Sequence, residues 1–577
     1  MSAGTRWRLP QVAGAEVQAL AHACGLRLPA ARVLWARGVR DAPAVRALLA
    51  PQLAELHDPF SMLGMEAAVT RLKRALDARE PILLCGDYDV DGTLSVVMLR
   101  KTLALLGNEP EFHVPDRLRE GYGMQPEVLE DAARRGVRLV ISVDTGIRAS
   151  VAVEHARRLG LDVIVTDHHL PEEALPPALA ILNPNQPGCA YPNKNLCGAG
   201  VTFKLIQALL TRTGHSEERR RAWIESLLML VALATVADVV PLTGENRVLV
   251  KRGLESLPRT KNFGLRALMQ VSKLDAAQPV RAWDVAFRLG PRLNAAGRIS
   301  HARAAIELFF APDAARAAAL AATLDEWNIE RRAEGDRILR EILLLPVEER
   351  TCGLVFASSG WHRGVIGIVA SRVAERHYRP TIILSIDEET GLAQGSARSI
   401  PSFHLLEALE SIERERPIFA KFGGHRQAAG LTLERERIGE LAERFDARAR
   451  AMLSSEDLVR TLEPDAELRP GELDDASAAE VLSLEPFGYG FPEPLFFVRG
   501  LRIAEQQVFA QKHLRVRFSD ARGASLVAKL WNGAEPGSAP LPEGTVDVLV
   551  SIQGNPGGAA RGYSAWDLKL VAVRSAG

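Results

Sequence analysis

The stretch "PILLCGDYDVDGTLSVVMLRKTLALLG" (residues 81–107) joins a short apolar run to three carboxylates and then to a second apolar run. The first run has the length and character of a buried parallel strand, and the second has the length of a helix. Asp87, Asp89 and Asp91 lie between the two. Like charges this close repel one another and raise each other's pKa, so the cluster costs stability unless a cation lies against it. The stretch therefore predicts a strand, a cation site and a helix, in that order.

The same alternation continues outward to about residue 240. Apolar runs at 111–115, 138–143 and 162–166 alternate with helical patterns at 126–136 and 150–160. Strands that alternate with helices in this way are typical of an α/β fold with a doubly wound parallel sheet. Ligands of such sheets bind at the carboxyl ends of the strands. We therefore expect a functional site where these strands end.

Further carboxylates and imidazoles follow the other strands. Asp144 in "SVDTG" follows one strand, His168 and His169 in "VTDHHLP" follow the next, and Asp238 ends the helix at 222–242. Each motif alone has a structural alternative: a solvated loop, a helix cap with surface histidines, or a helix-terminal aspartate without a role. Their convergence on one edge of a sheet favours a metal site.

Hard divalent cations prefer oxygen ligands, and imidazole adds affinity for manganese. A bridging aspartate can hold two such ions close together, where they clamp both oxygens of a phosphoryl displacement. We expect two ions, Mn²⁺ or Mg²⁺, and the candidate ligands are Asp89, Asp91, Asp144, His168 and Asp238.

Composition is that of an ordinary globular protein. The 577 residues include 71 basic and 71 acidic side chains, so the net charge gives no sign of nucleic-acid binding. Five scattered cysteines form no CxxC motif, which favours a reducing cytoplasm over a disulfide framework or a zinc site. The sequence has no apolar run of membrane-spanning length, and its N-terminus lacks the apolar core of a secretory signal. We expect a cytoplasmic protein that does not associate with membranes.

Changes of pattern along the chain divide it into five expected parts. A helical lead-in that packs on the first domain is expected first, and the catalytic α/β domain follows it. A long, largely uninterrupted connecting helix then leads to a second, smaller α/β domain. Short strands from about 495 onward predict a β-barrel of the oligonucleotide-binding kind, with a β-sandwich as the alternative. The expected bounds are 1–60, 61–302, 303–345, 346–455 and 456–577.

Four motifs, "DYDVDGTLS", "SVDTG", "VTDHHLP" and "ATVADVVPL", resemble in order those of the DHH phosphoesterase superfamily. Two later segments, "FRLGPRLNAAGRIS" and "SARSIPSFHLLEAL" with "KFGGHRQAAG", resemble the RecJ family of exonucleases within it. The resemblance extends from about residue 55 to the C-terminus. It implies a DHH domain, a DHHA1 domain and a terminal OB-type barrel.

The resemblance also implies residue roles. Asp89, Asp91, Asp144, His168 and Asp238 match metal ligands, and Asp87 is a further ligand or a neighbour of one. His169 would face the scissile phosphate as a hydrogen-bond donor or general acid. Catalytic or phosphate-binding roles are implied for Arg292, Asn294 and Arg298, with a salt bridge to the acidic cluster as the alternative for the arginines. Binding of the DNA strand is implied for Arg117, Ser396, Arg398 and His425, and for His425 the alternative is a residue that orders a Gly-rich turn.

The implied activity is that of a metal-dependent 5′-to-3′ exonuclease specific for single-stranded DNA. It would release mononucleotides and act in DNA recombination and repair. The resemblance implies help from a single-stranded-DNA-binding protein and a helicase, and we expect a monomer.

Two other functions stay open at this stage. The first is a small-substrate phosphodiesterase acting on oligoribonucleotides or cyclic dinucleotides, and a dinucleotide would need neither the long connecting helix nor the barrel. An inactive structural relative would have lost metal ligands, whereas every matched ligand position here is occupied.

Overall fold

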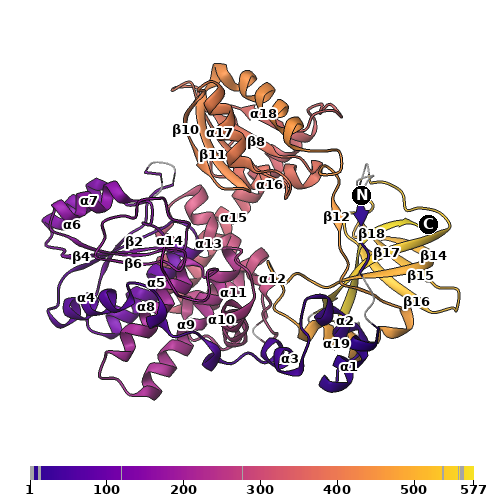
Figure 1. Cartoon of the computed structure of the whole chain (residues 1–577), viewed down its shortest axis with the longest axis horizontal. Coiled ribbons are helices and arrows are strands. Elements are labelled where there is room, and N and C mark those ends of the chain that lie inside the picture. The colour runs from indigo at the N-terminus through magenta and orange to yellow at the C-terminus, as the bar shows by residue number, and fades with distance from the viewer. Residues whose placement is uncertain are drawn as a thin grey trace.

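The computed structural model describes residues 5–10, 14–117, 120–121, 123–275, 277–535, 538–555, 558 and 564–576. It contains two α/β domains and a β-barrel, with the first domain at the left, the second at the top and the barrel at the right of Figure 1. No helix in these ranges is both long enough and apolar enough to cross a membrane.

The first domain is built on a five-stranded, fully parallel sheet with the strand order β3-β2-β4-β5-β6. The strands are β2 (Ile82–Gly86), β3 (Glu111–His113), β4 (Leu139–Val143), β5 (Asp162–Thr166) and β6 (Ala180–Leu182). Because the order reverses between β2 and β4, the carboxyl ends of these two strands form the topological switch point, where such sheets bind ligands.

Helices cover both faces of this sheet because side chains alternate between the faces along each strand. Ile82 and Leu84 join a core with α4, α5 and α8, whereas Leu83 and Cys85 join a second core with α6 and α7. The helices are α4 (Met65–Asp77), α5 (Val90–Leu105), α6 (Pro126–Arg134), α7 (Ser150–Arg158) and α8 (Gly198–Thr211). The predicted α/β fold with a doubly wound parallel sheet is confirmed.

A helical region completes the first domain and leads to the second. It contains α9 (Glu217–Ala237), α10 (Gly244–Ser256), α11 (Phe263–Val271), α12 (Ala282–Asp284), a π-helical turn (Val285–Leu289), α13 (Gly290–Ile299), α14 (Arg303–Phe309) and α15 (Ala314–Leu343). The largely uninterrupted helix expected over 303–345 is divided into two helices, and α15 is the long one. Pro312 cannot continue a helix, and Asp313 caps α15 by accepting a hydrogen bond from Arg316 N at 2.8 Å.

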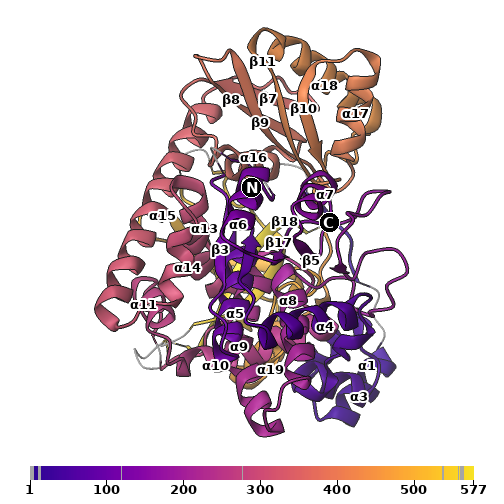
Figure 2. The same cartoon turned by 90° about the vertical axis from the view of Figure 1, so that its left-hand side faces the viewer.

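Helix α15 runs from the first domain to the second (Figure 2). The second domain has a mixed sheet in the order β10-β11-β9-β8-β7, between α17 and α18 on one face and α16 with the end of α15 on the other. Its elements are β7 (Leu354–Ser358), α16 (Ile366–His377), β8 (Thr381–Ile386), β9 (Leu392–Arg398), α17 (Leu405–Glu415), β10 (Phe419–Gly424), β11 (Ala428–Glu434) and α18 (Ile438–Met452).

The C-terminal domain is a closed barrel. Pairing of β14 with both β15 and β17 closes the sheet, so the barrel prediction is confirmed over the sandwich alternative. Its elements are β13 (Ala466–Glu467), α19 (Asp475–Ser483), β14 (Leu495–Phe509), β15 (His513–Ser519), β16 (Ser525–Leu530), β17 (Thr545–Gly554) and β18 (Trp566–Ser575).

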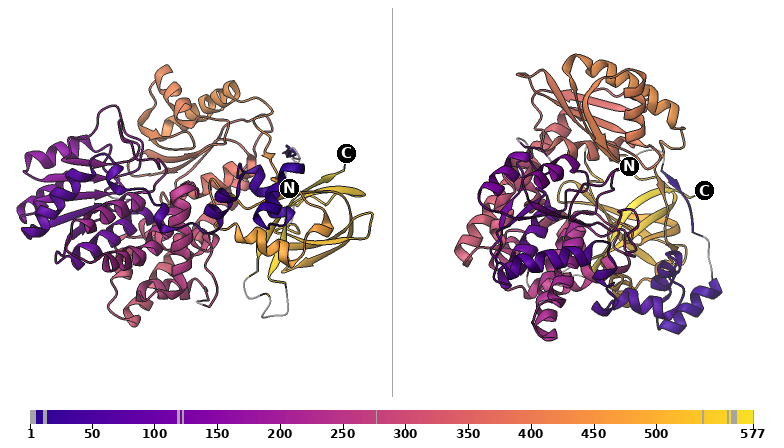
Figure 3. Two further views of the ribbon diagram at one scale, coloured as in Figure 1. Left: turned by 60° about the horizontal axis from the view of Figure 1, so that its bottom comes forward. Right: turned by 60° about the vertical axis from the view of Figure 1, so that its left-hand side comes forward.

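The N-terminal helices pack on this barrel, so the expectation that the lead-in packs on the first domain is wrong for these helices (Figure 3). They are α1 (Gly14–Cys24), α2 (Leu28–Ala36) and α3 (Ala42–Leu49). The expectation holds for the residues that follow them, because Leu53, Leu56 and Phe60 pack against the core of the first domain. Val33 and Leu34 lie in the barrel's core, and Arg32 pairs with Glu472 at 2.7 Å. Strand β1 (Arg6–Trp7) also pairs with β12 (Thr461–Leu462), just before the barrel. Helical periodicity reveals an apolar face but not its partner, so the sequence alone did not indicate this packing.

Candidate active site

Three aspartates lie in the turn from β2 into α5, as predicted. Asp89 caps α5, because its Oδ1 accepts a hydrogen bond from Gly92 N at 3.0 Å. The backbone of Asp87 approaches residue 92 so closely that only glycine fits there, since a Cβ would lie 2.6 Å from the backbone N and O of Asp87. The turn therefore brings the Asp87 and Asp89 carboxylates together at the end of the strand.

Asp91 lies on the first turn of α5 and faces the start of α8. Its Oδ2 accepts from Gly198 N at 2.5 Å and its Oδ1 accepts from Ala199 N at 2.8 Å. Free N–H groups and the dipole at a helix N-terminus favour a negative charge in this position. Gly198 also leaves room for Asp144, because a Cβ there would lie 2.5 Å from Asp144 Oδ1.

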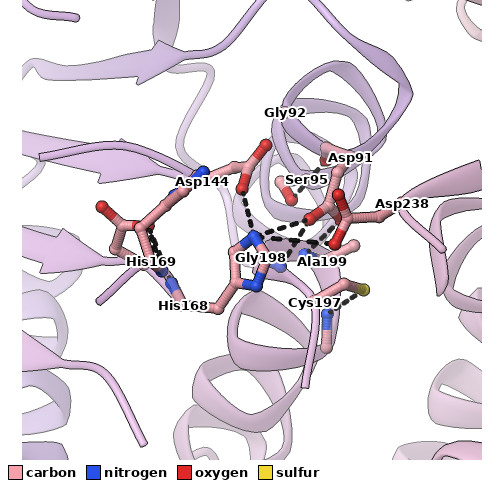
Figure 4. A network of polar contacts seen from close by, with 12 residues as sticks. Asp91, Gly92, Ser95, Asp144, His168, His169, Cys197, Gly198, Ala199 and Asp238 are labelled. Atoms are coloured by element: carbon pink, nitrogen blue, oxygen red, sulfur yellow. Dashed lines mark hydrogen bonds and ion pairs between the residues drawn. The ribbon is translucent and has the colours of Figure 1, made fainter. Parts of the chain in front are cut away.

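Three aspartates from different elements surround the side chain of His168 (Figure 4). Its Nε2 lies 3.3 Å from Asp144 Oδ1, 3.6 Å from Asp238 Oδ2 and 3.8 Å from Asp91 Oδ2. Asp238 is the C-cap of α9, and Val239 after it has φ 57°. A β-branched residue in the left-handed region is strained. Ending α9 so that Asp238 turns into this cluster therefore costs conformational energy.

Burial and mutual repulsion shift the pKa values of these carboxyls. The pKa of Asp144 is raised well above its usual value by burial and then by the charges of Asp91, Asp89 and Asp238. Burial also raises the pKa values of Asp87, Asp91 and Asp238, and neighbouring aspartates raise them further. Burial lowers the pKa of His168. Neutral imidazole is the form that binds a metal.

These residues fit a pair of hard divalent ions. Ligand atoms of Asp91, His168 and Asp238 lie within 4.8 Å of one another, and so do those of Asp87, Asp89 and Asp144. Asp144 also groups with His168 and His169 within the same limit, so it lies between the two sets. Asp238 Oδ2 is buried and has no hydrogen-bond partner among the described residues. A bound cation would satisfy that oxygen and offset the repulsion.

Asp167 holds both histidines, a role the sequence analysis did not assign to it. Its Oδ1 accepts from His168 N at 2.7 Å and lies 2.7 Å from His169 Nδ1. Burial lowers the pKa of His169, but the hydrogen bond and charge of Asp167 outweigh that effect and raise it. His169 therefore has an Nδ1 anchored by Asp167 and a pKa above its ordinary value. Asp167 is the first residue of the "DHH" motif, so the sequence did contain a sign of its importance.

Two asparagines after β6 were also missed. Asn183 Nδ2 donates to His169 O and Asn185 Nδ2 donates to His168 O, each at 2.8 Å. They fix the backbone of the histidine pair. "NPNQP" gives a turn signal but does not indicate which backbone it holds.

A small cavity lies between the first and second domains. It has a volume of about 360 Å³, and its lining includes Arg117 from the first domain with Arg363, Ser396 and Arg398 from the second. Arg398 Nη1 donates to Ser396 Oγ at 3.0 Å. Burial, followed by repulsion from Arg117, lowers the pKa of Arg398. Three arginines and a hydroxyl around one small cavity make a site suited to a phosphate.

The three predicted residues of the segment 290–299 have different surroundings. Asn294 Oδ1 accepts from Val90 N at 3.1 Å, which ties α13 to the aspartate turn. Arg298 is largely buried and donates to Gly364 O at 3.2 Å. Burial, followed by the charges of Arg117, Arg331 and Arg398, lowers the pKa of Arg298 to about 9. Arg298 thus lies among three other arginines.

Arg292 does not lie with the carboxylate cluster. Its Nε pairs with Asp325 of α15 at 2.8 Å and its Nη1 donates to Arg288 O at 2.7 Å. Arg292 thus makes a salt bridge, but with Asp325 of α15 and not with the acidic cluster that the alternative named. Its catalytic role stays a prediction that the geometry does not favour.

His425 begins the turn between β10 and β11, and its N donates to Ala428 O at 2.8 Å. Burial lowers its pKa, and the charges of Arg148 and His169 lower it further. His425 of the second domain therefore lies near the histidine pair of the first.

The barrel's basic residues are partly neutralised. Lys529 pairs with Asp567 at 2.7 Å and Arg517 pairs with Glu505 at 3.3 Å. Trp531 and His513 pack edge to face at 4.7 Å.

Three family profiles match this chain in order. They are the DHH family, N-terminal domain, over residues 81–235, the DHHA1 domain over 350–451, and the RecJ OB domain over 464–557.

Curated relatives and solved structures agree with the profiles. Single-stranded-DNA-specific exonuclease RecJ of Dickeya dadantii is 40% identical and covers 86% of this chain and 87% of its own length. The Escherichia coli protein of the same name is 38% identical, with 86% and 88% covered. The crystal structure of RecJ in complex with Mn²⁺ from Thermus thermophilus has a TM-score of 0.83 at 30% identity and covers 100% of this chain and 80% of that one. The chain therefore belongs to the RecJ family.

Proposed function

We propose that this chain hydrolyses single-stranded DNA from its 5′ end toward its 3′ end and releases mononucleotides. Its relatives are named single-stranded-DNA-specific exonucleases, and solved family structures hold Mn²⁺ or Mg²⁺. The observation that carries the proposal is that two sites lie next to each other: the carboxylate and histidine cluster, and a small arginine-lined cavity. Arg117 of the cavity lies against the ring of Tyr88, between Asp87 and Asp89 in the chain. Such an activity serves DNA recombination and repair.

The carboxylate cluster and the histidine pair would act on the scissile phosphate. Two Mn²⁺ or Mg²⁺ ions would be held by Asp89, Asp91, Asp144, His168 and Asp238, with Asp87 beside them. The ions, when bound, neutralise the phosphate charge and lower the pKa of a coordinated water. His169, positioned by Asp167, donates a hydrogen bond from Nε2 to a phosphate oxygen.

The arginine-lined cavity would set the polarity. Arg398, Ser396 and Arg117 would bind a terminal 5′ phosphate. Arg298, which lies near Arg117 and Arg398, and Asn294, which contacts the aspartate turn, would bind a phosphate beside the metals. A pocket that accepts only a chain end favours removal of terminal nucleotides over internal cleavage. His425, which projects from the second domain, contacts the strand backbone.

The partners and surroundings belong to the same proposal. A helicase and a single-stranded-DNA-binding protein would supply the strand, and the chain would act as a monomer in the cytoplasm. All five cysteines are free thiols, which suits a reducing compartment.

The test uses a single strand and a blunt duplex of the same sequence, each with a 5′ phosphate. The full chain is incubated with Mn²⁺, and Asp144→Ala is the control. We expect mononucleotides from the 5′ end of the single strand alone, and none with the variant. Turnover of a dinucleotide without cleavage of the long strand would instead support a small-substrate phosphodiesterase.

A further inference from the structure

Asn246 is a buried residue of α10 that lies outside the metal cluster but contacts two segments that lead into it. It belongs to the first turn of the helix and is 1% exposed. Its Nδ2 donates to Asn195 O at 2.6 Å and to Pro241 O at 3.0 Å. A side-chain amide has two N–H groups, so each of them satisfies one of these backbone carbonyls. Asn246 therefore joins two segments that are far apart in the chain.

The first of these segments carries Asp238. Pro241 comes three residues after Asp238, and Val239 between them has the strained φ of 57°. A strained backbone persists only where the surrounding structure holds it in place. The hydrogen bond from Asn246 to Pro241 O supplies such a contact, on the side of the strained residue away from α9. Asn246 thus helps to keep Asp238 turned into the cluster.

The second segment leads to the helix start that holds Asp91. Asn195 comes three residues before Gly198, whose backbone N donates to Asp91 Oδ2 at 2.5 Å. By binding Asn195 O, Asn246 fixes the chain that enters α8 at this point. Asp91 and Asp238 belong to the same group of possible ligands. A single side chain therefore supports two ligands of one group.

A network of polar side chains fixes the amide of Asn246 in turn. Its Oδ1 accepts from Asn193 Nδ2 at 2.9 Å, and the same Nδ2 lies 3.3 Å from Glu245 Oε2. Glu245 pairs with Lys204 at 2.6 Å, and both side chains are fully buried. The hydroxyl of Tyr191 donates to Glu245 at 2.8 Å. Buried networks in which every group is paired are rigid, so Asn246 is held in one orientation.

We propose that Asn246 is a positioning residue for one of the two metal ions and acts through the backbone of the ligand segments. This inference rests on the metal-dependent activity proposed above. Groups that orient metal ligands contribute to metal affinity, and their loss weakens binding by roughly ten- to a hundredfold. Because Asn246 supports ligands of one group, its removal should weaken one ion and spare the other. The affected group is Asp91, His168 and Asp238, and the spared group is Asp87, Asp89 and Asp144.

The test counts the Mn²⁺ ions that the full, metal-free chain binds in the absence of DNA. Electron paramagnetic resonance measures the free Mn²⁺ at each point of a titration, which gives the number of bound ions and both dissociation constants. The wild type is expected to bind two ions. Asn246→Ala should bind one ion as tightly as the wild type and the other at least about tenfold more weakly.

Two further variants separate positioning from stability. Val250→Ala removes two methyl groups from a fully buried side chain of the same helix. The cavity should lower its melting temperature, but both ions should bind as in the wild type. Asn193→Ala leaves Asn246 in place without its hydrogen-bond donor and should weaken the same ion by a smaller factor. It also provides the test if Asn246→Ala does not fold, and unchanged binding of both ions by Asn193→Ala would then refute the positioning role.

The proposal is overturned if Asn246→Ala binds both ions as tightly as the wild type or weakens both equally. It is also overturned if Val250→Ala loses the same ion. Incubation of the wild type with Mn²⁺ and a 5′-phosphorylated single strand tests the proposed function separately. A wild type that binds two ions but leaves this strand uncut refutes only the exonuclease, whereas a cut strand with unchanged Mn²⁺ binding by Asn246→Ala refutes only the positioning role.

Discussion

Asp144 is the residue on which the metal cluster depends most. It lies between the two groups of possible ligands and is only 2% exposed. Its raised pKa means that its contribution to stability is complete below the unfolded value near 3.8 and is lost as the pH rises through the folded value. Near neutral pH the metal-free cluster therefore destabilises the fold.

Asp144→Asn should raise the melting temperature in EDTA at pH 7.5 by a few degrees, about 2–4 °C per kcal/mol of repulsion relieved. It should also abolish nuclease activity and the further rise that Mn²⁺ causes in the wild type. Differential scanning calorimetry with and without Mn²⁺ measures both effects. Asp77→Asn, an exposed partner of Lys73, is the matched control and should change neither. A lower melting temperature of Asp144→Asn in EDTA would show that repulsion does not limit stability.

Glu485 predicts a second pH dependence, away from the metal cluster. Burial raises its pKa to about 7 from a usual value of 4.5. Its contribution to stability is therefore complete below about pH 4.5 and is lost as the pH rises through 7. Glu485→Gln should melt like the wild type at pH 5 but be more stable above pH 7, by on the order of 1 kcal/mol. Melting curves from pH 5 to 8 test this, with the exposed Glu255→Gln as control. A gain of equal size at both pH values would contradict a titrating Glu485.

At the scale of elements, helix starts shape both parts of the active site. The start of α8 receives the Asp91 carboxylate, and the start of α16 borders the arginine-lined cavity. In both places a glycine lets the helix approach closely. A Cβ at Gly367 would lie 2.9 Å from Ser396 Oγ and 3.2 Å from an Arg398 nitrogen.

Gly367→Ala should therefore weaken recognition of the terminal phosphate. We expect KM for a 5′-phosphorylated strand to rise about tenfold, the loss of one charge-assisted hydrogen bond, with a smaller change in kcat. Steady-state kinetics on 5′-phosphorylated and 5′-hydroxyl strands measure the preference. Gly439→Ala is the control, because a Cβ on that helical glycine has no neighbour within 4 Å among the described residues. If Gly367→Ala keeps the full preference for a 5′ phosphate, the cavity does not bind the chain end.

At the scale of the whole molecule, Arg247 joins the catalytic domain to the segment that leads into the barrel. This arginine of α10 is 4% exposed and has backbone carbonyls, not a carboxylate, as partners. It donates to Leu48 O at 3.0 Å, Leu484 O at 2.5 Å and Pro486 O at 3.1 Å. Burial lowers its pKa to about 10. One side chain thus holds α3 and the segment before β14 against the first domain.

Arg247→Met keeps the length of the side chain but leaves these carbonyls without a donor. The free energy of unfolding should fall by roughly 2–4 kcal/mol, and the barrel should become mobile relative to the catalytic domain. Denaturant unfolding gives the first quantity, and small-angle scattering gives the second as a larger radius of gyration. Arg252→Met on the same helix removes an arginine that pairs with Glu255 and Gln52, and it should have little effect. Unchanged scattering of Arg247→Met would show that other contacts hold the barrel.

The sequence by itself determined the local architecture and the chemistry of the cluster. Strand and helix periods are local properties, and a parallel sheet brings the ends of its strands to one edge, so Asp87, Asp89, Asp91, Asp144 and His168 were placed together in advance. Asp238 was expected in the same cluster because the helix that carries it ends in the same domain.

Tertiary structure alone decided which partners the other residues meet. Arg292 and Arg298 lie on one short helix, yet the first pairs with Asp325 and the second lies among three arginines. The N-terminal helices have an apolar face that the barrel covers, and Asp167 holds two histidines where it could equally have been a ligand. Periodicity shows which face of an element is buried, but it does not show which residue will be the neighbour. Arg292 and Asp325 are 33 positions apart, and Arg32 and Glu472 are 440 positions apart, so a local pattern encodes neither contact.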